Sequence, residues 1–405
     1  MSSLLIRNAT QIVSPRPGVL RGPGLNDLSI RNDLSILIRD GHIETIGPDQ
    51  ELAATHKGAE LDAAGKAVIP GLVDAHTHLL FGGNRADEFA LRTAGASYEE
   101  IAAQGGGIAR TVAATRKSTK SELVRQGVER LDRAMAHGIT TLEAKTGYGL
   151  NVESEMTMLD AMTELDKVHA VDVVPTFLGA HGVPKDMETD AYLNLVRSMI
   201  PEAAKHARFC DIFCEQGYFT PEQSVSLLEL ACDHGMLPRL HADQFNEIGC
   251  LEAAIELGAV SVDHLEATSE RGAKLIGQSD TAAVMLPGVS LFLDISFAPA
   301  RSLIDNNCIP VIATDFNPGS NMCLNLPLML SLACMKMRMS VGEALCSATQ
   351  NAAHALRLDK VGCIEPGWQA DLLVLDTEDY RDMFYFYGEN HVHTVIKRGV
   401  AHARH

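Results

Sequence analysis

Residues 67–78 read AVIPGLVDAHTH, an apolar run that ends in the polar triplet His76-Thr77-His78. A short apolar run with a polar carboxyl end is typical of a buried β-strand. Seven more runs of this kind follow along the chain: residues 139–145, 171–181, 208–214, 237–243, 259–264, 282–287 and 309–315. Helix-like segments lie between them, at residues 121–136, 153–167, 221–234 and 247–257. Eight strands that alternate with helices predict parallel βαβ units and an α/β fold closed as a (β/α)8 barrel of TIM type.

A doubly wound open sheet is the competing architecture. Such a sheet usually carries a glycine-rich phosphate-binding loop after its first strand. Here the first strand ends in His76-Thr77-His78 instead, so the barrel is the better interpretation.

Both ends of the chain carry strand-like segments of a different kind. These segments are residues 4–13, 34–46, 372–375 and 392–398. Neither end has enough apolar residues for a core of its own, so we expect the two ends to combine in one small β-sandwich domain. The expected division gives residues 1–66 and 359–405 to this composite domain, and residues 67–358 to the barrel.

The composition narrows the classes of partner. The 405 residues are 46% hydrophobic, which is enough for a large core, and 34 basic against 52 acidic side chains give a formal charge of −18. Such a charge repels phosphate, so we expect no nucleic-acid partner and no anionic membrane surface. The sequence has no apolar run of about 18 residues and no signal-peptide pattern, and we therefore expect a soluble cytoplasmic protein.

Nine cysteines are scattered along the chain without a C-x-x-C pair. This pattern predicts small buried thiols in a reducing compartment, not a disulfide framework. It also lacks the paired spacing of a cysteine zinc site. Ligands for any metal are therefore expected among the histidines and carboxylates.

Six polar side chains occupy the carboxyl ends of the predicted strands. They are His76, His78, His181, His241, His264 and Asp315. In a barrel these strand ends meet on the face where active sites form. A lone His-x-His is common on a solvated strand, and a lone Asp often caps a helix. All six together predict a metal site, in which three histidines and one aspartate hold a divalent cation and leave a position for water.

The flanking blocks resemble a known family. The hexapeptide VDAHTH at residues 73–78, after its apolar run, is similar to the amidohydrolase superfamily of metal-dependent hydrolases. Further blocks together resemble the imidazolonepropionases of histidine degradation: residues 81–87 (FGGNRAD), 98–111, 143–150 (EAKTGYGL), 175–184, 241–245 (HADQF) and 313–321. The similarity extends from about residue 60 to residue 375.

The resemblance implies a reaction, a cofactor and a ligand set. The reaction is the hydrolysis of 4-imidazolone-5-propanoate, a small anionic substrate, to N-formimidoyl-L-glutamate by a homodimer. The implied metal ligands are His76, His78, His241 and Asp315, which hold one zinc or iron ion per subunit. Superfamily members with two metals often use a lysine at the end of the fourth barrel strand, where this chain reads Phe213-Cys214-Glu215. Its absence there supports a single metal ion.

The implied substrate contacts are Arg85, Tyr148, His181, Gln244, Asn317, Gly319 and Ser320. Arg85 suits the propionate carboxylate, because guanidinium pairs with carboxylate through two hydrogen bonds. The alternative for Arg85 is a surface salt bridge with Asp87 or Glu88. We expect His181 to donate a hydrogen bond to the substrate ring, and the backbone amides of residues 316–320 to contact the product.

The expected catalytic residues are His264, Asp315 and Gln244. His264 lies near the predicted metal and is the candidate for holding the oxyanion or moving protons. Asp315 is a second candidate for accepting a proton. Position 244 is where some relatives carry a glutamate base. An amide cannot take a proton, so Gln244 is expected to contact substrate through hydrogen bonds.

Two other functions compete with this interpretation. One is another mononuclear amidohydrolase, such as a deaminase acting on a purine-like or pyrimidine-like ring, but Gln244 argues against it. The other is a catalytically silent barrel that serves as an interaction scaffold. A scaffold needs none of the four predicted ligands, and it would purify without stoichiometric metal.

Overall fold

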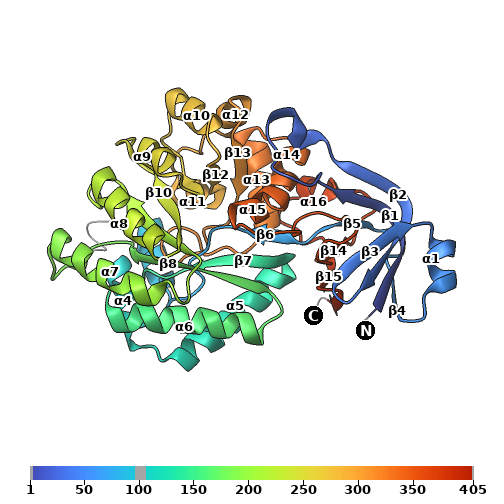
Figure 1. The fold of residues 1–405 in the computed structure, drawn as a ribbon, viewed down its shortest axis with the longest axis horizontal. Coiled ribbons are helices and arrows are strands. Elements are labelled where there is room, and N and C mark those ends of the chain that lie inside the picture. Colours follow the sequence, from blue (N-terminus) through green and yellow to red (C-terminus); the bar gives the residue numbers. More distant parts are fainter. Residues whose placement is uncertain (1–2, 96–105, 404–405) are drawn as a thin grey trace.

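The computed structural model describes residues 3–95 and 106–403, and these form a barrel with a second β-sheet beside it (Figure 1). Residues 98–105, part of one block of the family resemblance, lie outside the described residues. The two ends of the chain lie close together in the unit that contains the second sheet (Figure 1).

The barrel contains eight parallel strands in chain order. They are β6 (Leu72–Asp74), β7 (Ile139–Lys145), β8 (Asp172–Ala180), β9 (Phe209–Cys214), β10 (Leu237–Ala242), β11 (Ser261–His264), β12 (Ala282–Met285) and β13 (Ile309–Ile312). A bridge between Thr77 and Phe316 joins the segments that follow β6 and β13. This bridge places the His76-Thr77-His78 triplet beside Asp315, so the expected α/β barrel is confirmed.

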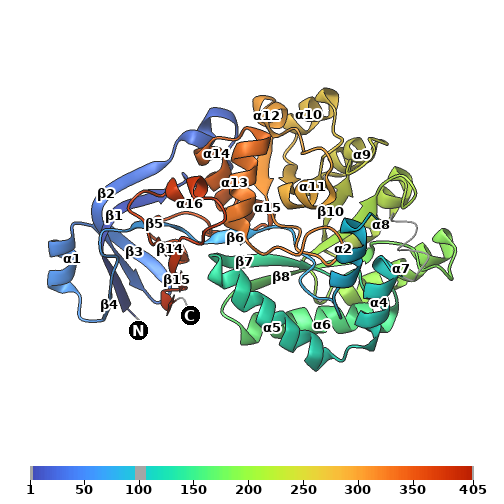
Figure 2. The same cartoon turned by 180° about the vertical axis from the view of Figure 1, so that it is seen from behind.

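Helices surround the barrel strands (Figure 2). They are α2 (Ala86–Thr93), α4 (Ile108–Lys117), α5 (Lys120–Ala136), α6 (Val152–Val168), α7 (Thr189–Ala203), α8 (Pro221–Asp233), α9 (Cys250–Leu257), α10 (Glu270–Gly277), α11 (Pro287–Leu293), α12 (Ala300–Asp305), α13 (Leu326–Met337), α14 (Val341–Ser347) and α15 (Gln350–Ala355). Reciprocal hydrogen bonds between Thr119 and Glu122 cap the start of α5. The four helices expected from sequence are present, although α9 begins at Cys250 and not at residue 247.

Strands from both ends of the chain form the second sheet, in the order β16-β15-β14-β5-β1-β2-β3 with β4 paired to β1. They are β1 (Ser3–Ser14), β2 (Ser29–Arg39), β3 (His42–Gly47), β4 (Ala59–Asp62), β5 (Ala67–Pro70), β14 (Leu372–Leu375), β15 (Val392–Lys397) and β16 (Val400–Ala403). The short helices α1 (Asp49–Thr55) and α16 (Asp382–Tyr385) and the 3-10 helix η1 (Gly22–Asn26) lie in the connections. The strands of the expected sandwich are hydrogen-bonded into one continuous sheet.

The two faces of this sheet have different partners because successive strand residues point to opposite sides. Val68 and Leu372 belong to the small core of the terminal unit. Their neighbours Ile69 and Leu373 belong to the large core shared with the barrel helices. The second sheet is therefore anchored to the barrel through one buried face.

The strand expected over residues 67–78 is divided in two at Gly71. β5 pairs with β1 and β14 in the terminal sheet, whereas β6 starts the barrel. A Cβ atom at Gly71 would overlap the Thr140 side chain, so the close approach of the two segments requires glycine. We therefore propose that the first domain boundary falls near Gly71 and not between residues 66 and 67; the second boundary, near residue 358, stays a proposal.

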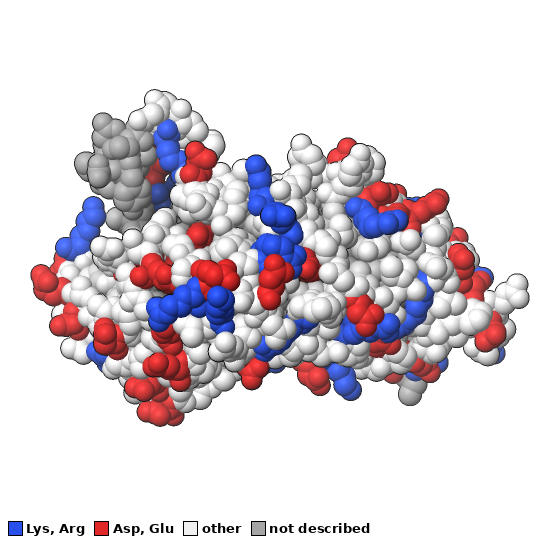
Figure 3. Space-filling model, turned by 90° about the horizontal axis from the view of Figure 1, so that it is seen from above, with Lys and Arg blue, Asp and Glu red and all other residues white. Residues whose placement is uncertain are grey.

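Acidic and basic side chains are interspersed in small groups on the face shown in Figure 3. Among the described residues, no helix is both long enough and apolar enough to cross a membrane.

Candidate metal centre and active site

The ends of β6 and β10 and the segment after β13 bring together the four predicted metal ligands. His76, His78, His241 and Asp315 are at most 3% exposed. Asp315 Oδ1 lies 3.4 Å from Nε2 of His76 and 3.4 Å from Nε2 of His78. One potential ligand atom from each of these three residues lies within 4.8 Å of the others, as expected for groups that can hold one ion.

Unpaired polar atoms show that this centre fits a metal ion. Among the described residues, His76 Nε2, His241 Nε2 and Asp315 Oδ1 are buried atoms without a hydrogen-bond partner. Buried polar atoms without a partner are rare in folded proteins and call for a specific explanation. A divalent cation bound by imidazole nitrogen and carboxylate oxygen would satisfy all three.

Two aspartates that sequence reasoning missed orient the ligand histidines. His76 Nδ1 lies 2.6 Å from Asp263 Oδ2, and His241 Nδ1 lies 3.0 Å from Asp211 Oδ2. When Nδ1 donates to a carboxylate, the Nε2 lone pair is left for a metal. Burial lowers the pKa of His241 to about 3, despite the neighbouring carboxylate, which favours the neutral ligand form. The sequence gives one indication that Asp211 has a special role, because it is a charged residue inside the apolar run RFCDIFC.

His264 lies beside the predicted ligands at the end of β11. Its ring centroid is 5.2 Å from that of His241, and its Nδ1 is 3.3 Å from Glu266 Oε2. Its backbone φ of 92° lies in the left-handed region, which is uncommon for a residue with a side chain. Such conformations cluster at functional sites, and this one places His264 where it can reach a molecule bound at the centre.

A pocket of about 200 Å³ opens above the metal centre. Its lining includes all seven predicted substrate residues: Arg85, Tyr148, His181, Gln244, Asn317, Gly319 and Ser320. The predicted residues His78, His241, His264 and Asp315 line it as well. Sequence reasoning missed the apolar part of the lining, which is formed by Ile108, Phe213, Tyr218, Phe245 and Leu293. The pocket therefore combines polar groups near the centre with apolar walls, as is typical of small-molecule sites.

Arg85 both lines this pocket and forms a salt bridge. Its Nε donates to Glu88 Oε2 at 2.7 Å, and its side chain is only 15% exposed. A Cβ atom at Gly319 would lie 3.0 Å from Arg85 Nη1, so the small residue leaves room for the guanidinium. The Glu88 pair thus fixes the base of the guanidinium, so the salt-bridge alternative is confirmed for Glu88, and the contact with a substrate carboxylate stays a prediction.

Hydrogen bonds from two missed residues hold the loop that carries Tyr148. The buried Glu155 carboxylate accepts from the backbone N–H groups of Gly147, Gly149 and Leu150 at 2.7–3.1 Å. Arg116 donates to the carbonyl oxygens of Gly149 and Leu150. Burial raises the pKa of Tyr148, so its hydroxyl stays protonated and can donate to a substrate.

The Glu155→Gln substitution tests this support. The amide NH2 group faces backbone donors and cannot accept from them, so we expect the free energy of unfolding to fall by about 1–3 kcal/mol. We also expect a higher KM, because Tyr148 loses its fixed position. Thermal unfolding and steady-state kinetics measure the two effects. The matched control is Glu153→Gln, at an exposed position of the same helix; equal behaviour of the two variants would contradict the assignment.

The hydrogen bond of His181 reverses its expected role. His181 Nδ1 lies 3.0 Å from the carbonyl oxygen of Gly147, so Nδ1 carries the proton and donates. Burial lowers the pKa of His181, which favours the neutral ring. Nε2 of a neutral ring with a protonated Nδ1 can only accept. The expectation that His181 donates to the substrate ring is therefore wrong for this tautomer.

The backbone amides of the loop after Asp315 are already hydrogen-bonded. The Asn317 side-chain oxygen accepts from Gly319 N–H and Ser320 N–H at 2.7 and 2.8 Å. Phe316 N–H donates to the Thr314 hydroxyl. Asn317 closes the turn with its own side chain, and the contact of these amides with product stays a prediction. Asn317 thus shapes the wall of the pocket.

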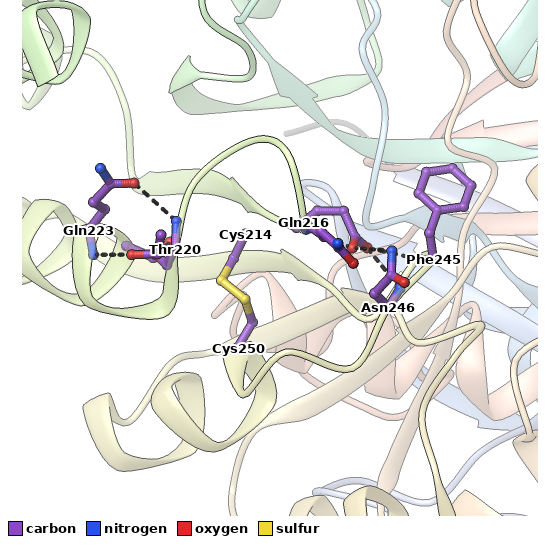
Figure 4. The surroundings of a disulfide bond; sticks show 9 residues. Cys214, Gln216, Thr220, Gln223, Phe245, Asn246 and Cys250 are labelled. Atoms are coloured by element: carbon purple, nitrogen blue, oxygen red, sulfur yellow. Dashed lines mark hydrogen bonds between the residues drawn. A yellow bond between two sulfur atoms is a disulfide. The ribbon is translucent and has the colours of Figure 1, made fainter. Parts of the chain in front are cut away.

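The segment that carries Gln244 is held on two sides. Glu215 accepts from the N–H groups of Phe245 and Asn246 at 2.9 and 3.3 Å. A disulfide joins Cys214, at the end of β9, to Cys250, at the start of α9 (Figure 4). The expectation that the cysteines are all free thiols is wrong for this pair, because the fold brings residues 36 positions apart to a Cα–Cα distance of 6.0 Å.

Comparisons with known proteins agree with this geometry. The amidohydrolase family matches residues 67–401. The imidazolonepropionase of Brevibacillus brevis is 45% identical, covering 97% of this chain and 96% of the relative. The imidazolonepropionase of Rubrobacter xylanophilus is 46% identical and covers 98% of both chains.

Solved structures with 18–19% identity share the fold. An adenosine deaminase from Xanthomonas campestris with bound zinc has a TM-score of 0.71 and covers 99% of this chain and 92% of its own. N-isopropylammelide isopropylaminohydrolase from Burkholderia multivorans has a TM-score of 0.68 and covers 99% and 98%.

The barrel and the buried ligand set define the class, and the family match agrees: the protein belongs to the amidohydrolase family. Within that family, the identity over nearly the whole chain places it among the imidazolonepropionases.

Proposed function

We propose that this protein hydrolyses 4-imidazolone-5-propanoate to N-formimidoyl-L-glutamate. One observation carries the proposal: three of the four buried predicted ligands and Arg85 line the same small pocket. The substrate has a ring carbonyl to be attacked and a carboxylate arm to be bound, and the pocket offers a group for each.

The residues that would hold the metal are His76, His78, His241 and Asp315. We propose zinc or iron, since imidazole and carboxylate ligands suit both. When bound, the metal lowers the pKa of a coordinated water toward about 7 and thereby supplies a nucleophile at neutral pH.

Three pocket residues position the substrate in this proposal. Arg85 pairs with the propionate carboxylate through hydrogen bonds from its Nη groups. The protonated hydroxyl of Tyr148 donates to a substrate oxygen. Neutral His181 accepts a ring N–H at Nε2, since its Nδ1 is already bound to the Gly147 carbonyl.

Proton transfer falls to the residues beside the ligands. Ring opening requires a proton on the leaving nitrogen, and His264 is the group placed to hold and deliver it. Gln244 cannot act as a base, but its amide can donate to one substrate atom and accept from another. Asp315, the remaining candidate, can take a proton from water at Oδ2, which lies 3.5 Å from the Ser320 hydroxyl.

The Arg85→Lys substitution should weaken substrate binding with little change in the chemical step. Lysine cannot form two parallel hydrogen bonds to a carboxylate. We expect KM to rise about 10- to 100-fold while kcat stays within a few-fold, because the carboxylate arm is bound equally in the ground and transition states. The control is Arg125→Lys, at an exposed arginine that pairs with Glu129. An unchanged KM in Arg85→Lys would refute the carboxylate contact.

The function is tested by incubating the metal-loaded protein with freshly prepared imidazolonepropionate. We expect loss of the substrate and the appearance of formimidoylglutamate, detected by mass spectrometry. A deaminase would instead release ammonia from an amino-substituted purine or pyrimidine, which is tested in parallel. No product from folded, metal-loaded protein would defeat the proposal.

We also propose a cytoplasmic homodimer. Free thiols are typical of reducing compartments, and seven of the nine cysteines are free. The dimer is supported by the family resemblance, and light scattering at assay concentration measures it.

A further inference from the structure

A layer of five charged side chains lies inside the barrel, directly beneath the metal centre. They are Glu143, Lys145, Asp211, Arg239 and Asp263, and each is 0% exposed. Branched aliphatic side chains usually fill this part of a parallel barrel. None of the five lines the pocket, and the reaction proposed above gives no role to Glu143, Lys145 or Arg239.

Ion pairs connect the whole layer. Lys145 Nζ lies 2.7 Å from Asp211 Oδ2 and 3.4 Å from Asp263 Oδ2. It also lies 2.8 Å from Glu143 Oε1. On the other side, Arg239 Nη2 lies 3.0 Å from Asp263 Oδ2. Lys145 is thus the group that joins Asp211 to Asp263.

Burying five charged side chains costs free energy. Buried ion pairs often contribute no more to stability than apolar side chains of the same size, because the charges lose their hydration. The layer also has three carboxylates and two cations, which leaves one negative charge in excess. The cost of burial and the excess negative charge are both explained if the layer supports the cation site above it.

The two aspartates connect the layer to that site. Asp263 accepts from Nδ1 of His76, and Asp211 accepts from Nδ1 of His241. Each aspartate therefore contacts a predicted metal ligand on one side and Lys145 on the other. Arg239 also holds Asp263, but Lys145 is the cation that contacts both carboxylates orienting His76 and His241.

We propose that Lys145 is a positioning residue for the metal centre. It holds Asp211 and Asp263 at a fixed separation, so that His76 and His241 direct Nε2 toward one common point. Lys145 does not line the pocket, and its contacts toward the ligands run through the two aspartates.

Zinc affinity of the metal-free protein, measured by competition with a chromophoric chelator, tests the proposal. The Lys145→Met variant leaves three carboxylates with one cation and is expected to lose stability as well as affinity. The decisive variant is therefore the double substitution Lys145→Met with Glu143→Gln, which removes one charge of each sign. We expect it to fold and to bind zinc about 10- to 100-fold more weakly, the range typical for loss of groups that orient metal ligands.

A matched control separates positioning from general core stability. Lys397 is also buried and pairs with Asp172 and Asp371, but it lies in the terminal sheet. Lys397→Met should lower the melting temperature and leave zinc affinity unchanged. Wild-type zinc affinity in the charge-balanced double variant would overturn the proposal. Failure of that variant to fold would also overturn it, since Lys145 would then hold the core together and not the ligands. Because zinc binding is the readout, the outcome does not depend on which substrate the enzyme uses.

Discussion

The His241→Ala variant is expected to lose its bound metal and to hydrolyse imidazolonepropionate at least about 10³-fold more slowly in kcat/KM. His241 supplies a buried Nε2 atom that has no hydrogen-bond partner among the described residues. Its removal leaves the centre one ligand short and deprives the buried Asp211 of its Nδ1–H donor. Both effects act against metal binding.

Metal content by mass spectrometry and steady-state kinetics measure the two losses together. The control is His234→Ala, which changes an exposed histidine at the end of α8 and should alter neither quantity. A His241→Ala protein that retains one metal ion per chain would show that His241 is not a ligand.

The His264→Ala variant is expected to keep its metal and to lose about 10²- to 10⁴-fold in kcat, the range typical of a missing general acid or base. His264 lies beside His241 and lines the pocket, so it can reach the leaving nitrogen of the ring. The set of four predicted ligands is complete without it. Folding should be little affected, because the side chain packs at the pocket surface and not in the apolar core.

The decisive observation is whether His264→Ala loses turnover while it keeps its metal. Loss of metal in His264→Ala would make His264 a ligand, which its proximity to His76 and His241 would permit. Retention of both metal and full turnover would remove it from the mechanism. A matched Glu266→Gln variant tests whether the neighbouring carboxylate, 3.3 Å from His264 Nδ1, contributes to the same step.

The barrel was predictable because its strands are continuous apolar runs that end in polar residues. β7, for example, spans the same residues, 139–145, that the sequence pattern marks. The first strand was not predicted correctly, since the apolar run pairs with β1 and β14 before Gly71 and with β7 after it. Gly71 itself lies in close contact with Thr140. That contact joins residues far apart in sequence and has no local signal.

The site, like the fold, has parts with a local sequence pattern and parts that depend on long-range contacts. The predicted ligands could be chosen from the sequence because they share one local pattern, a polar residue at the end of an apolar strand. The supporting groups were not, because each acts on a different segment: Asp263 on His76, and Glu155 on the Tyr148 loop. The donor role of His181 was misjudged for the same reason, since its Nδ1 partner is the carbonyl of Gly147, 34 residues away.

The central claim is that one metal ion, held by His76, His78, His241 and Asp315, drives ring hydrolysis in this pocket. Titration of the metal-free protein with zinc, with formimidoylglutamate formation measured at each step, tests it most directly. We expect the rate to rise linearly to one equivalent per chain and then to remain constant. Full activity without metal, or a rate that keeps rising to two equivalents, would contradict the account.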